Sequence, residues 1–205
     1  MKFTQVIVIG LFLSISSTSA FAGPEAAPLG QIQIESPGQM TDLFLRAHPN
    51  SISKDAVEHA FAFYFKHRQE FVKKNIITIV DYTQDAEEKR MHVIQLKRSF
   101  PMQSFLAAHG QGYSNRFPTT VHTVPGGYRT GKVSYWSEGK KRFRMDIDFF
   151  KDGEFHPSGL EVHPIKYGPD QPTHGCVGLQ PADYKVAAPL IVGESCLYIF
   201  QKGYL

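Results

Sequence analysis

The chain has 205 residues, of which 42% are hydrophobic and 13% aromatic, a content sufficient to build a buried core. The same composition, with 17 glycines and 13 prolines, excludes a disordered or collagen-like chain. The 22 basic and 19 acidic residues leave a net charge of only +3, a balance that argues against nucleic acid as a partner.

The first 22 residues have the pattern of a secretory signal peptide. Lys2 supplies a positive start, Val6–Ile15 forms an apolar run, and Ala20-Phe21-Ala22 fits a small-x-small cleavage site. The run is shorter than the roughly 20 residues that a membrane-spanning helix needs. We therefore predict cleavage after Ala22 and a mature protein that is periplasmic or otherwise exported to the cell envelope, without a stable membrane anchor.

Residues 23–74 are predicted to form an N-terminal extension that contains one amphipathic helix. Residues 23–49 are rich in proline, glycine, alanine and glutamine, which favours an extended lead-in with little periodic structure. From Ser53 to Phe71, apolar residues recur at helical spacing, and Ser53 is a good N-cap. We expect this helix to pack its aromatic stripe on the main body.

Residues 75–205 are predicted to form a mainly β domain, because the hydrophobic period changes from helical spacing to two. Strands are expected at Ile76–Val80, Met91–Leu96, Phe105–Ala108, Val133–Trp136, Phe143–Phe149, Leu160–His163 and Leu197–Phe200. Turn signals at Asp85–Glu88, Pro125–Gly127, Glu138–Gly139 and Asp152–Gly153 separate them. This spacing is typical of an antiparallel sandwich or barrel, and a short helix is expected after Gly178.

The candidate catalytic residues lie between the last predicted strands. A loop after the strand that carries His163 leads to Thr173-His174-Gly175-Cys176. A cysteine nucleophile needs a neighbouring base and backbone N–H groups directed at the developing oxyanion, and Gly175-Cys176 can supply the N–H groups. Both His163 and His174 are candidate bases, but a histidine on an adjacent strand is better placed than one two residues before the cysteine.

The sequence Thr173-His174-Gly175-Cys176 resembles the [S/T]-H-G-C motif of L,D-transpeptidase (YkuD-like) catalytic domains, in which a catalytic histidine precedes the motif. The wider chain is similar to the murein L,D-transpeptidase catalytic domain-like branch in four further segments: Ile77–Tyr82, Glu88–Arg90, Ala108–Gly112 and Tyr128–Gly131. The resemblance covers about residues 75–200. It implies an L,D-transpeptidase-like β-sandwich with an N-terminal helix and a short helix after the catalytic cysteine.

The resemblance also implies a reaction on peptidoglycan stem peptides, with no organic cofactor and no metal. Cys176 would attack the carbonyl of the third residue and release the terminal D-amino acid, with His163 as base. His174 and Gly175 would contribute backbone groups to the oxyanion site, and His109 and Thr173 are candidate substrate-binding residues. The acceptor stays open between a stem peptide, a protein amine, a free D-amino acid and water, the last of which would make the protein an L,D-carboxypeptidase.

Three features depart from the family pattern. His163 is followed by Pro164 where glycine is common, and only 12 residues separate it from Cys176, fewer than usual. Cys176 is followed by Val177-Gly178-Leu179, without the arginine that many relatives carry there. The connecting loop is therefore expected to be shortened, and recognition of a substrate carboxylate must come from elsewhere.

Several alternatives stay open at this point. Cys176 and Cys196 can form a disulfide in an oxidising compartment. A zinc site would draw on His109, His122, His156, His163, His174 and Cys176, although no H-E-x-x-H motif or paired cysteine spacing supports it. A non-catalytic wall-binding module would keep the β scaffold without turnover. The oligomeric state is not determined by the sequence.

Overall fold

The structure is a computed structural model of the chain and describes residues 36–97, 99–109, 123–135, 143–166, 168 and 173–202. All of these belong to one compact unit, Ile32–Leu205. The predicted signal peptide, His122, Trp136 and the predicted turn at Glu138–Gly139 lie outside the described residues. Within the described part, no helix is long and apolar enough to span a membrane.

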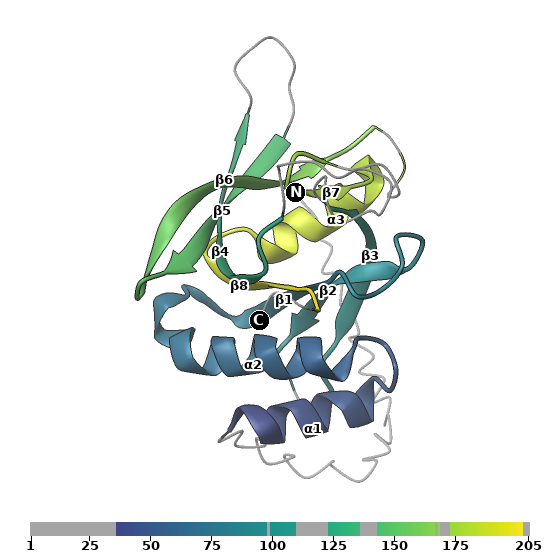
Figure 1. Cartoon of the computed structure of the whole chain (residues 1–205), viewed down its shortest axis with the longest axis vertical. Coiled ribbons are helices and arrows are strands. Elements are labelled where there is room, and N and C mark those ends of the chain that lie inside the picture. Colours follow the sequence, from purple (N-terminus) through teal and green to yellow (C-terminus); the bar gives the residue numbers. More distant parts are fainter. Residues whose placement is uncertain are drawn as a thin grey trace, which may run out of the picture. The chain divides into compact units, whose positions relative to one another are not determined.

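The described residues form four helical segments and eight strands (Figure 1). The helices are α1 (Pro37–Ala47), α2 (Lys54–His67), the short 3-10 helix η1 (Arg68–Glu70) and α3 (Pro181–Ile191). The strands are β1 (Lys73–Asp81), β2 (Lys89–Gln95), β3 (Met102–Ala108), β4 (Gly126–Tyr135), β5 (Phe143–Lys151), β6 (Glu154–Pro164), β7 (Val177–Leu179) and β8 (Ser195–Phe200).

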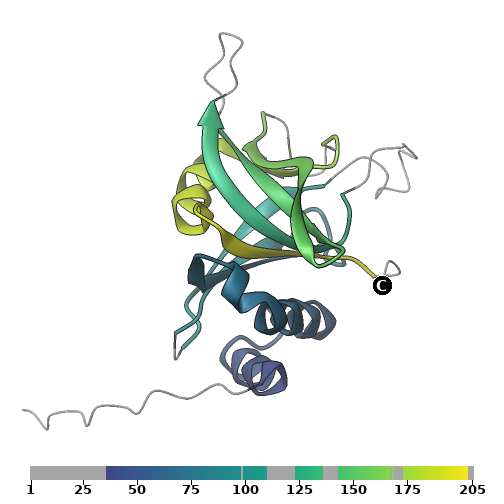
Figure 2. The same cartoon turned by 90° about the vertical axis from the view of Figure 1, so that its left-hand side faces the viewer.

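The strands close into a barrel in the order β1-β2-β3-β7-β6-β5-β4-β8. Neighbours are antiparallel except for β1–β8 and β6–β7, which run parallel. The predicted mainly β fold is confirmed, but the predicted β-sandwich is wrong, because β8 lies between β1 and β4 and closes the sheet on itself. Figure 2 shows the strong curvature of the strands. Closure gives each described strand a hydrogen-bonded neighbour on both sides, although the short β7 pairs with only part of β3 and of β6.

The barrel interior is filled by alternate side chains of all eight strands and by α3. Val80 of β1 and Val162 of β6 are fully buried there, together with Ala187 and Ile191 of α3. The sequence prediction of a short helix after Gly178 is confirmed by α3. Because this helix packs inside the sheet, the segment after Cys176 is tied directly to the main core.

The helix predicted from Ser53 is confirmed as α2. The Ser53 hydroxyl accepts a 3.3 Å hydrogen bond from the Ala56 N–H, the expected N-cap contact. The α-helix ends at His67, and η1 continues the predicted helical stretch to Glu70.

The expectation of an extended lead-in over residues 23–49 is wrong for Pro37–Ala47, which form α1. The Ser36 hydroxyl caps this helix by accepting a 3.2 Å hydrogen bond from the Gln39 N–H. The extension therefore contributes two α-helices rather than one. Met40 and Phe44, four positions apart on one face of α1, are its buried apolar residues, and Pro37 stands in the first turn, where proline is compatible with a helix.

α2 covers the outer face of β1 and β8, and α1 packs against α2 on the side away from the barrel (Figure 1). Phe61 of α2 is fully buried with Ile77 and Ile79 of β1 and Cys196 of β8. This second core is built from the residues of β1 and β8 that point away from the barrel interior. The aromatic stripe of α2 is therefore structural.

Two turn signals in the sequence have different outcomes. Asp152 and Gly153 form the two-residue connection between β5 and β6, both with positive φ, as the sequence predicts. In the signal at Pro125–Gly127, both glycines belong instead to β4. A Cβ on Gly127 would lie 2.0 Å from the ring of Phe63, so glycine is required there for close packing rather than for a turn.

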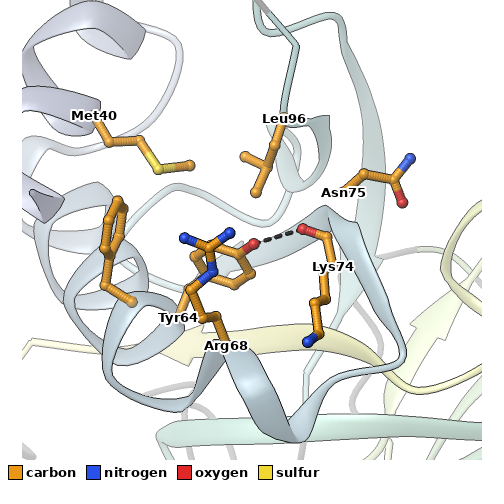
Figure 3. A pocket seen from close by; sticks show the side chains of 7 residues that line it. Met40, Tyr64, Arg68, Lys74, Asn75 and Leu96 are labelled. Carbon is orange, nitrogen blue, oxygen red and sulfur yellow. Dashed lines mark hydrogen bonds between the residues drawn. The ribbon is translucent and has the colours of Figure 1, made fainter. Parts of the chain in front are cut away.

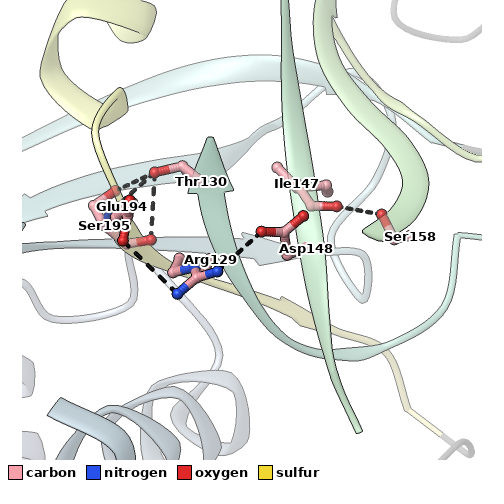
Figure 4. A network of polar contacts seen from close by, with 7 residues as sticks. All are labelled: Arg129, Thr130, Ile147, Asp148, Ser158, Glu194 and Ser195. Carbon is pink, nitrogen blue, oxygen red and sulfur yellow. Dashed lines mark hydrogen bonds and ion pairs between the residues drawn. The ribbon is translucent and has the colours of Figure 1, made fainter. Parts of the chain in front are cut away.

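Polar contacts fasten β4 to the turn that enters β8 (Figure 4). The Thr130 hydroxyl accepts a 2.9 Å hydrogen bond from the Ser195 N–H, and both residues are fully buried. Arg129 pairs with Asp148 of β5 at 3.2 Å and with Glu194 at 3.7 Å. These contacts hold the seam at which the barrel closes.

Candidate functional site

Cys176 lies immediately before β7, beside the middle of β6. Val177 pairs with Val162 in the parallel β6–β7 ladder, which places Cys176 level with Glu161. The side chain of Val177 is buried in the barrel core, whereas Cys176 is only partly buried. The thiol is thus held at one end of the barrel by the strand that follows it.

Residues from distant parts of the sequence meet at this end of the barrel. The end of β3 lies against the start of β7 because Ala108 pairs with Gly178. The Tyr82 hydroxyl, just after β1, donates a 3.2 Å hydrogen bond to the Ala108 carbonyl. The rings of Tyr82 and His109 meet edge to face at 5.8 Å. His109, a candidate substrate-binding residue, is therefore buried near the thiol's strand.

Two threonines hold the backbone on either side of the thiol. The Thr173 hydroxyl donates a 2.6 Å hydrogen bond to the Cys176 carbonyl, and its N–H donates to the His109 carbonyl at 2.7 Å. The Thr123 hydroxyl donates to the Gly175 carbonyl at 2.8 Å. Thr123 was not a candidate from the sequence, since no motif marks a lone threonine that acts across 52 residues.

The residue before Cys176 needs to be glycine for conformational reasons. Gly175 is buried and has a φ of +108°, a backbone conformation that side chains other than glycine rarely adopt. His174 is exposed, so its imidazole points away from the packed interior. The Gly-Cys pair therefore depends on a local turn that orients the backbone around the thiol.

The electrostatic environment of Cys176 does not by itself favour a thiolate. Burial raises the pKa of the Cys176 thiol, a backbone hydrogen bond from Glu161 acts in the opposite direction, and the Glu161 carboxylate raises the pKa further. The Glu161 carboxylate accepts a 2.6 Å hydrogen bond from Nη1 of Arg144 on β5. Arg144 thus offsets part of the negative charge beside the thiol.

His163 lies on β6, the strand next to the thiol, where it pairs with Gly178. Its Nδ1 lies 3.0 Å from the Pro164 carbonyl oxygen. Because a carbonyl only accepts, Nδ1 carries the proton and the lone pair is on Nε2. Among the residues that the structure describes, no hydrogen bond joins His163 to Cys176.

Gly178 lies on β7 beside His163 of β6, and Thr173, at the start of the segment that ends in Cys176, packs against it. A Cβ on Gly178 would lie 2.6 Å from Cγ2 of Ile165 and 3.0 Å from Cγ2 of Thr173. Because Gly178 has no side chain, Ile165, which follows β6, and Thr173, which precedes Cys176, can both pack closely against β7. This is consistent with the short connection between His163 and Cys176.

Arg90, to which the sequence reasoning assigned no role, is a buried cation at the same end of the barrel. Only 3% of the residue is exposed, and its Nε donates a 2.6 Å hydrogen bond to the Ala107 carbonyl. Its guanidinium lies 5.2 Å from the centre of the Tyr82 ring. Burial lowers the pKa of the Arg90 guanidinium, while Tyr82 and Asp85 act in the opposite direction.

Two pockets are lined by residues that the structure describes. The first, of about 330 Å³, is lined by residues where β4 starts, β5 ends and β6 starts. The second, of about 300 Å³, lies between the helices and the start of β1 (Figure 3). There the Tyr64 hydroxyl donates a 2.5 Å hydrogen bond to the Lys74 carbonyl, and Met40 and Leu96 line the wall.

Both cysteines are free, so the alternative of a disulfide between Cys176 and Cys196 is not realised in this structure. Cys196 is fully buried under α2, and burial raises the pKa of its thiol well above the usual range. Within the described ranges, no three histidine, cysteine, aspartate or glutamate side chains are arranged to hold a metal ion. His122, one of the zinc candidates, is outside those ranges.

Among solved structures, the chain is similar to an L,D-transpeptidase from Stackebrandtia nassauensis, with 17% identity, a TM-score of 0.42, and coverage of 82% of this chain and 78% of the other. It is also similar to an L,D-transpeptidase from Mycobacterium smegmatis, with 13% identity, a TM-score of 0.40 and coverage of 62% of this chain. The chain spans 59% of the length of the Mycobacterium smegmatis protein. No curated protein matches the chain.

The sequence also matches a protein family over residues 48–145, a segment that runs from before α2 into β5. His163 and Cys176 lie beyond this segment. The family is described as the L,D-transpeptidase catalytic domain. The resemblance that the Thr173–Cys176 motif indicates is therefore confirmed by a family match over a separate part of the chain, residues 48–145.

Proposed function

We propose that the protein is an exported cysteine acyltransferase that acts on peptidoglycan stem peptides as an L,D-transpeptidase. The observation that carries the proposal is the position of Cys176, a partly buried thiol at the end of the barrel, next to the strand that bears His163. The family match supports the general class of reaction. Export to the cell envelope rests on the predicted signal peptide, residues 1–22.

In the first half of the reaction, Sγ of Cys176 attacks the carbonyl carbon of the third stem-peptide residue and forms a C–S bond. Nε2 of His163 takes the thiol proton. The N–H groups of Gly175 and Cys176, together with the backbone at His174, stabilise the oxyanion. Collapse breaks the C–N bond, and His163 returns the proton to the departing amine of the terminal D-amino acid.

In the second half, an acceptor amine attacks the thioester, His163 takes its proton, and the new amide releases the Cys176 thiol. Attack by water would instead release a tripeptide, which is the L,D-carboxypeptidase alternative. The first half is the same for both, so the acceptor depends on how the cleft excludes water.

His163 is supported as the base by its tautomer. The Pro164 carbonyl holds the proton on Nδ1 and leaves the lone pair on Nε2. Catalytic hydrogen bonds often form only when substrate is bound, so the missing contact in the free protein is compatible with this role. His109 and Thr173 stay predicted substrate-binding residues.

The proposal is tested by intact-mass spectrometry of the mature protein incubated with a disaccharide-tetrapeptide. We expect an acyl adduct that is absent in Cys176→Ala and strongly reduced in His163→Ala. The matched controls Cys196→Ala and His59→Ala remove a buried thiol and an exposed imidazole far from the site, and both should keep the adduct.

The products distinguish the remaining alternatives. Cross-linked dimers indicate a transpeptidase, and tripeptide alone indicates a carboxypeptidase. Absence of an adduct and of turnover over a range of stem peptides, with wall binding unchanged in Cys176→Ala, would overturn the proposal in favour of a wall-binding module.

A further inference from the structure

Two consecutive backbone carbonyls at the end of β3 accept hydrogen bonds from side chains of other parts of the chain. Nε of Arg90 donates to the Ala107 carbonyl at 2.6 Å, and the Tyr82 hydroxyl donates to the Ala108 carbonyl at 3.2 Å. The two donor side chains also contact each other, since the guanidinium lies 5.2 Å from the centre of the Tyr82 ring. We call Arg90 and Tyr82 the β3 clamp.

Arg90 reaches β3 because it stands at an irregularity in β2. Met91 of β2 pairs with Phe105 of β3. The next pair along the ladder joins Lys89 to Leu106, so β2 advances by two residues where β3 advances by one. Arg90 is therefore the extra residue of a β-bulge. Bulges redirect side chains and are over-represented beside active sites, and here the redirected side chain is a buried guanidinium.

Both members of the clamp are anchored in the barrel. The Tyr82 N–H donates a 3.0 Å hydrogen bond to the Phe200 carbonyl at the end of β8. Nη1 of Arg90 lies 3.5 Å from the Gln84 carbonyl, in the turn between β1 and β2. Burying a guanidinium is costly unless it is hydrogen-bonded, so the contacts of Arg90 disfavour any movement of β3 away from this turn. The end of β3 is thus tied to the opposite side of the sheet from β7.

The clamped end of β3 supports Cys176 on both sides. Before the thiol, the His109 carbonyl accepts a 2.7 Å hydrogen bond from the Thr173 N–H, and the Thr173 hydroxyl donates to the Cys176 carbonyl at 2.6 Å. After the thiol, Gly178 of β7 pairs with Ala108. The backbone that carries the thiol therefore takes its position from the end of β3 that the clamp holds.

We propose that Arg90 and Tyr82 are positioning residues for Cys176: through the end of β3, they hold the thiol-bearing segment in the orientation that acylation requires, without touching the substrate. This inference rests on the proposed function. A displacement of a reacting group by about 1 Å can lower a rate by roughly 100-fold. A loosened clamp should therefore lower the rate of acylation and leave substrate affinity unchanged.

Tyr82→Phe tests the clamp with the smallest change, because it removes the hydroxyl and keeps the ring that contacts Arg90. Single-turnover acylation by a disaccharide-tetrapeptide is followed by intact-mass spectrometry. We expect the maximum rate to fall about tenfold, with the half-saturating concentration unchanged. Tyr64→Phe is the matched control, because the Tyr64 hydroxyl donates to the Lys74 carbonyl, away from β3, and both values should stay as in wild type.

Two substitutions of Arg90 test the other member of the clamp. Arg90→Met removes every donor, whereas Arg90→Lys keeps the charge and one donor group at a single point. We expect the rate of acylation in Arg90→Lys to lie between those of wild type and Arg90→Met. If Arg90→Met does not fold, Arg90→Lys and Tyr82→Phe decide the question. Wild-type rates in both of these variants would overturn the inference.

Amide hydrogen exchange over residues 173–178 separates this inference from the proposed function, since it needs no turnover. We expect exchange there to be about tenfold faster in Tyr82→Phe and Arg90→Lys, and unchanged in Tyr64→Phe. Faster exchange in a protein whose wild type has no turnover would support the clamp and overturn the enzyme. Turnover by wild type, with exchange and rate unchanged in both clamp variants, would overturn the clamp and leave the enzyme in place.

A further pair of results would also overturn the inference. A raised half-saturating concentration, or a lowered rate without faster exchange, would mean that the clamp residues act on the substrate directly rather than through β3.

Discussion

Nη1 of Arg144 lies 2.6 Å from the carboxylate of Glu161, the residue level with the Cys176 thiol in the β6–β7 ladder. The two side chains are 32% and 20% exposed, so the pair is partly shielded from water. Any change in its charge therefore acts on the thiol through a medium less polar than bulk water.

This pair predicts opposite effects for two substitutions. Removing the carboxylate in Glu161→Gln lowers the pKa of the Cys176 thiol, because the Glu161 charge disfavours the thiolate. Removing the cation in Arg144→Gln leaves that charge uncompensated and raises the pKa. We expect alkylation of Cys176 at pH 7 to become about 2 to 5 times faster in the first variant and slower in the second.

The rate of reaction with iodoacetamide as a function of pH measures this. Glu58→Gln, an exposed carboxylate on α2, should leave the profile unchanged. Equal profiles for Glu161→Gln and Arg144→Gln would show that the pair does not control the thiol.

Thr173→Val removes the hydroxyl that donates to the Cys176 carbonyl while keeping the shape of the side chain. Because Thr173 is only 1% exposed, the carbonyl loses a buried partner, and we expect the free energy of unfolding to fall by about 1–2 kcal/mol. Acylation should fall about tenfold, since the nucleophile's backbone is less well positioned.

Denaturant unfolding and single-turnover mass spectrometry measure the two effects of Thr173→Val. Thr41→Val is the matched control, because the Thr41 hydroxyl is buried and makes no hydrogen bond within the described part of the chain. Loss of stability with full acylation would show that Thr173 is structural only.

Gly178→Ala should destabilise the protein by roughly 1–3 kcal/mol, because its Cβ would lie 2.6 Å from Ile165 and 3.0 Å from Thr173. Gly38→Ala is the matched control: nothing lies within 4 Å of its added Cβ, and alanine favours the helix. Thermal unfolding of both variants checks the prediction. A Gly178→Ala protein as stable as wild type would mean that Ile165 and Thr173 can move away from β7 without loss of stability.

His92 predicts a loss of stability in acid. Burial lowers the pKa of His92 from 6.5 to about 4, although Asp81 acts in the opposite direction. Its ring nitrogens lie 2.9 Å from the Ser104 hydroxyl and 3.2 Å from the Gln84 side-chain oxygen. Between pH 6.5 and 4 the unfolded chain binds a proton that the folded protein does not, so stability falls as the pH falls through this window.

The lowered pKa of His92 should reduce the free energy of unfolding by about 3 kcal/mol between pH 7 and pH 4. This loss should be absent in His92→Gln. Urea unfolding at pH 7 and pH 4 measures it, with the exposed His59→Gln as control. An unchanged pH dependence in His92→Gln would assign the acid sensitivity to other groups.

Elements with a strong local pattern were predictable from the sequence. The alternating residues of β1, β2 and β5, the N-cap at Ser53 and the Asp152–Gly153 hairpin all follow from side-chain period and turn chemistry. The helix α1 was missed because the prediction for residues 23–49 rested on their proline and glycine, which favour an extended chain, whereas Pro37 begins the helix, a position at which proline is favoured. Strand β7 was missed because three residues carry no period at all.

The candidate site shows the same division. Thr173-His174-Gly175-Cys176 is contiguous in the sequence, so a motif can identify it. Thr123, Arg144 and Arg90 act across long stretches of chain, and no local pattern marks them. Their contacts exist only because strands distant in sequence become neighbours.

The sequence by itself determined that this chain has a mainly β domain, and its motif identified the family and a candidate thiol. Those features depend on short-range chemistry: side-chain alternation, capping and a four-residue motif. Only the tertiary structure decided that β8 closes the sheet into a barrel and that Glu161, paired with Arg144, lies beside Cys176. These depend on strand order and register, which are set by packing over the whole core rather than by any local segment.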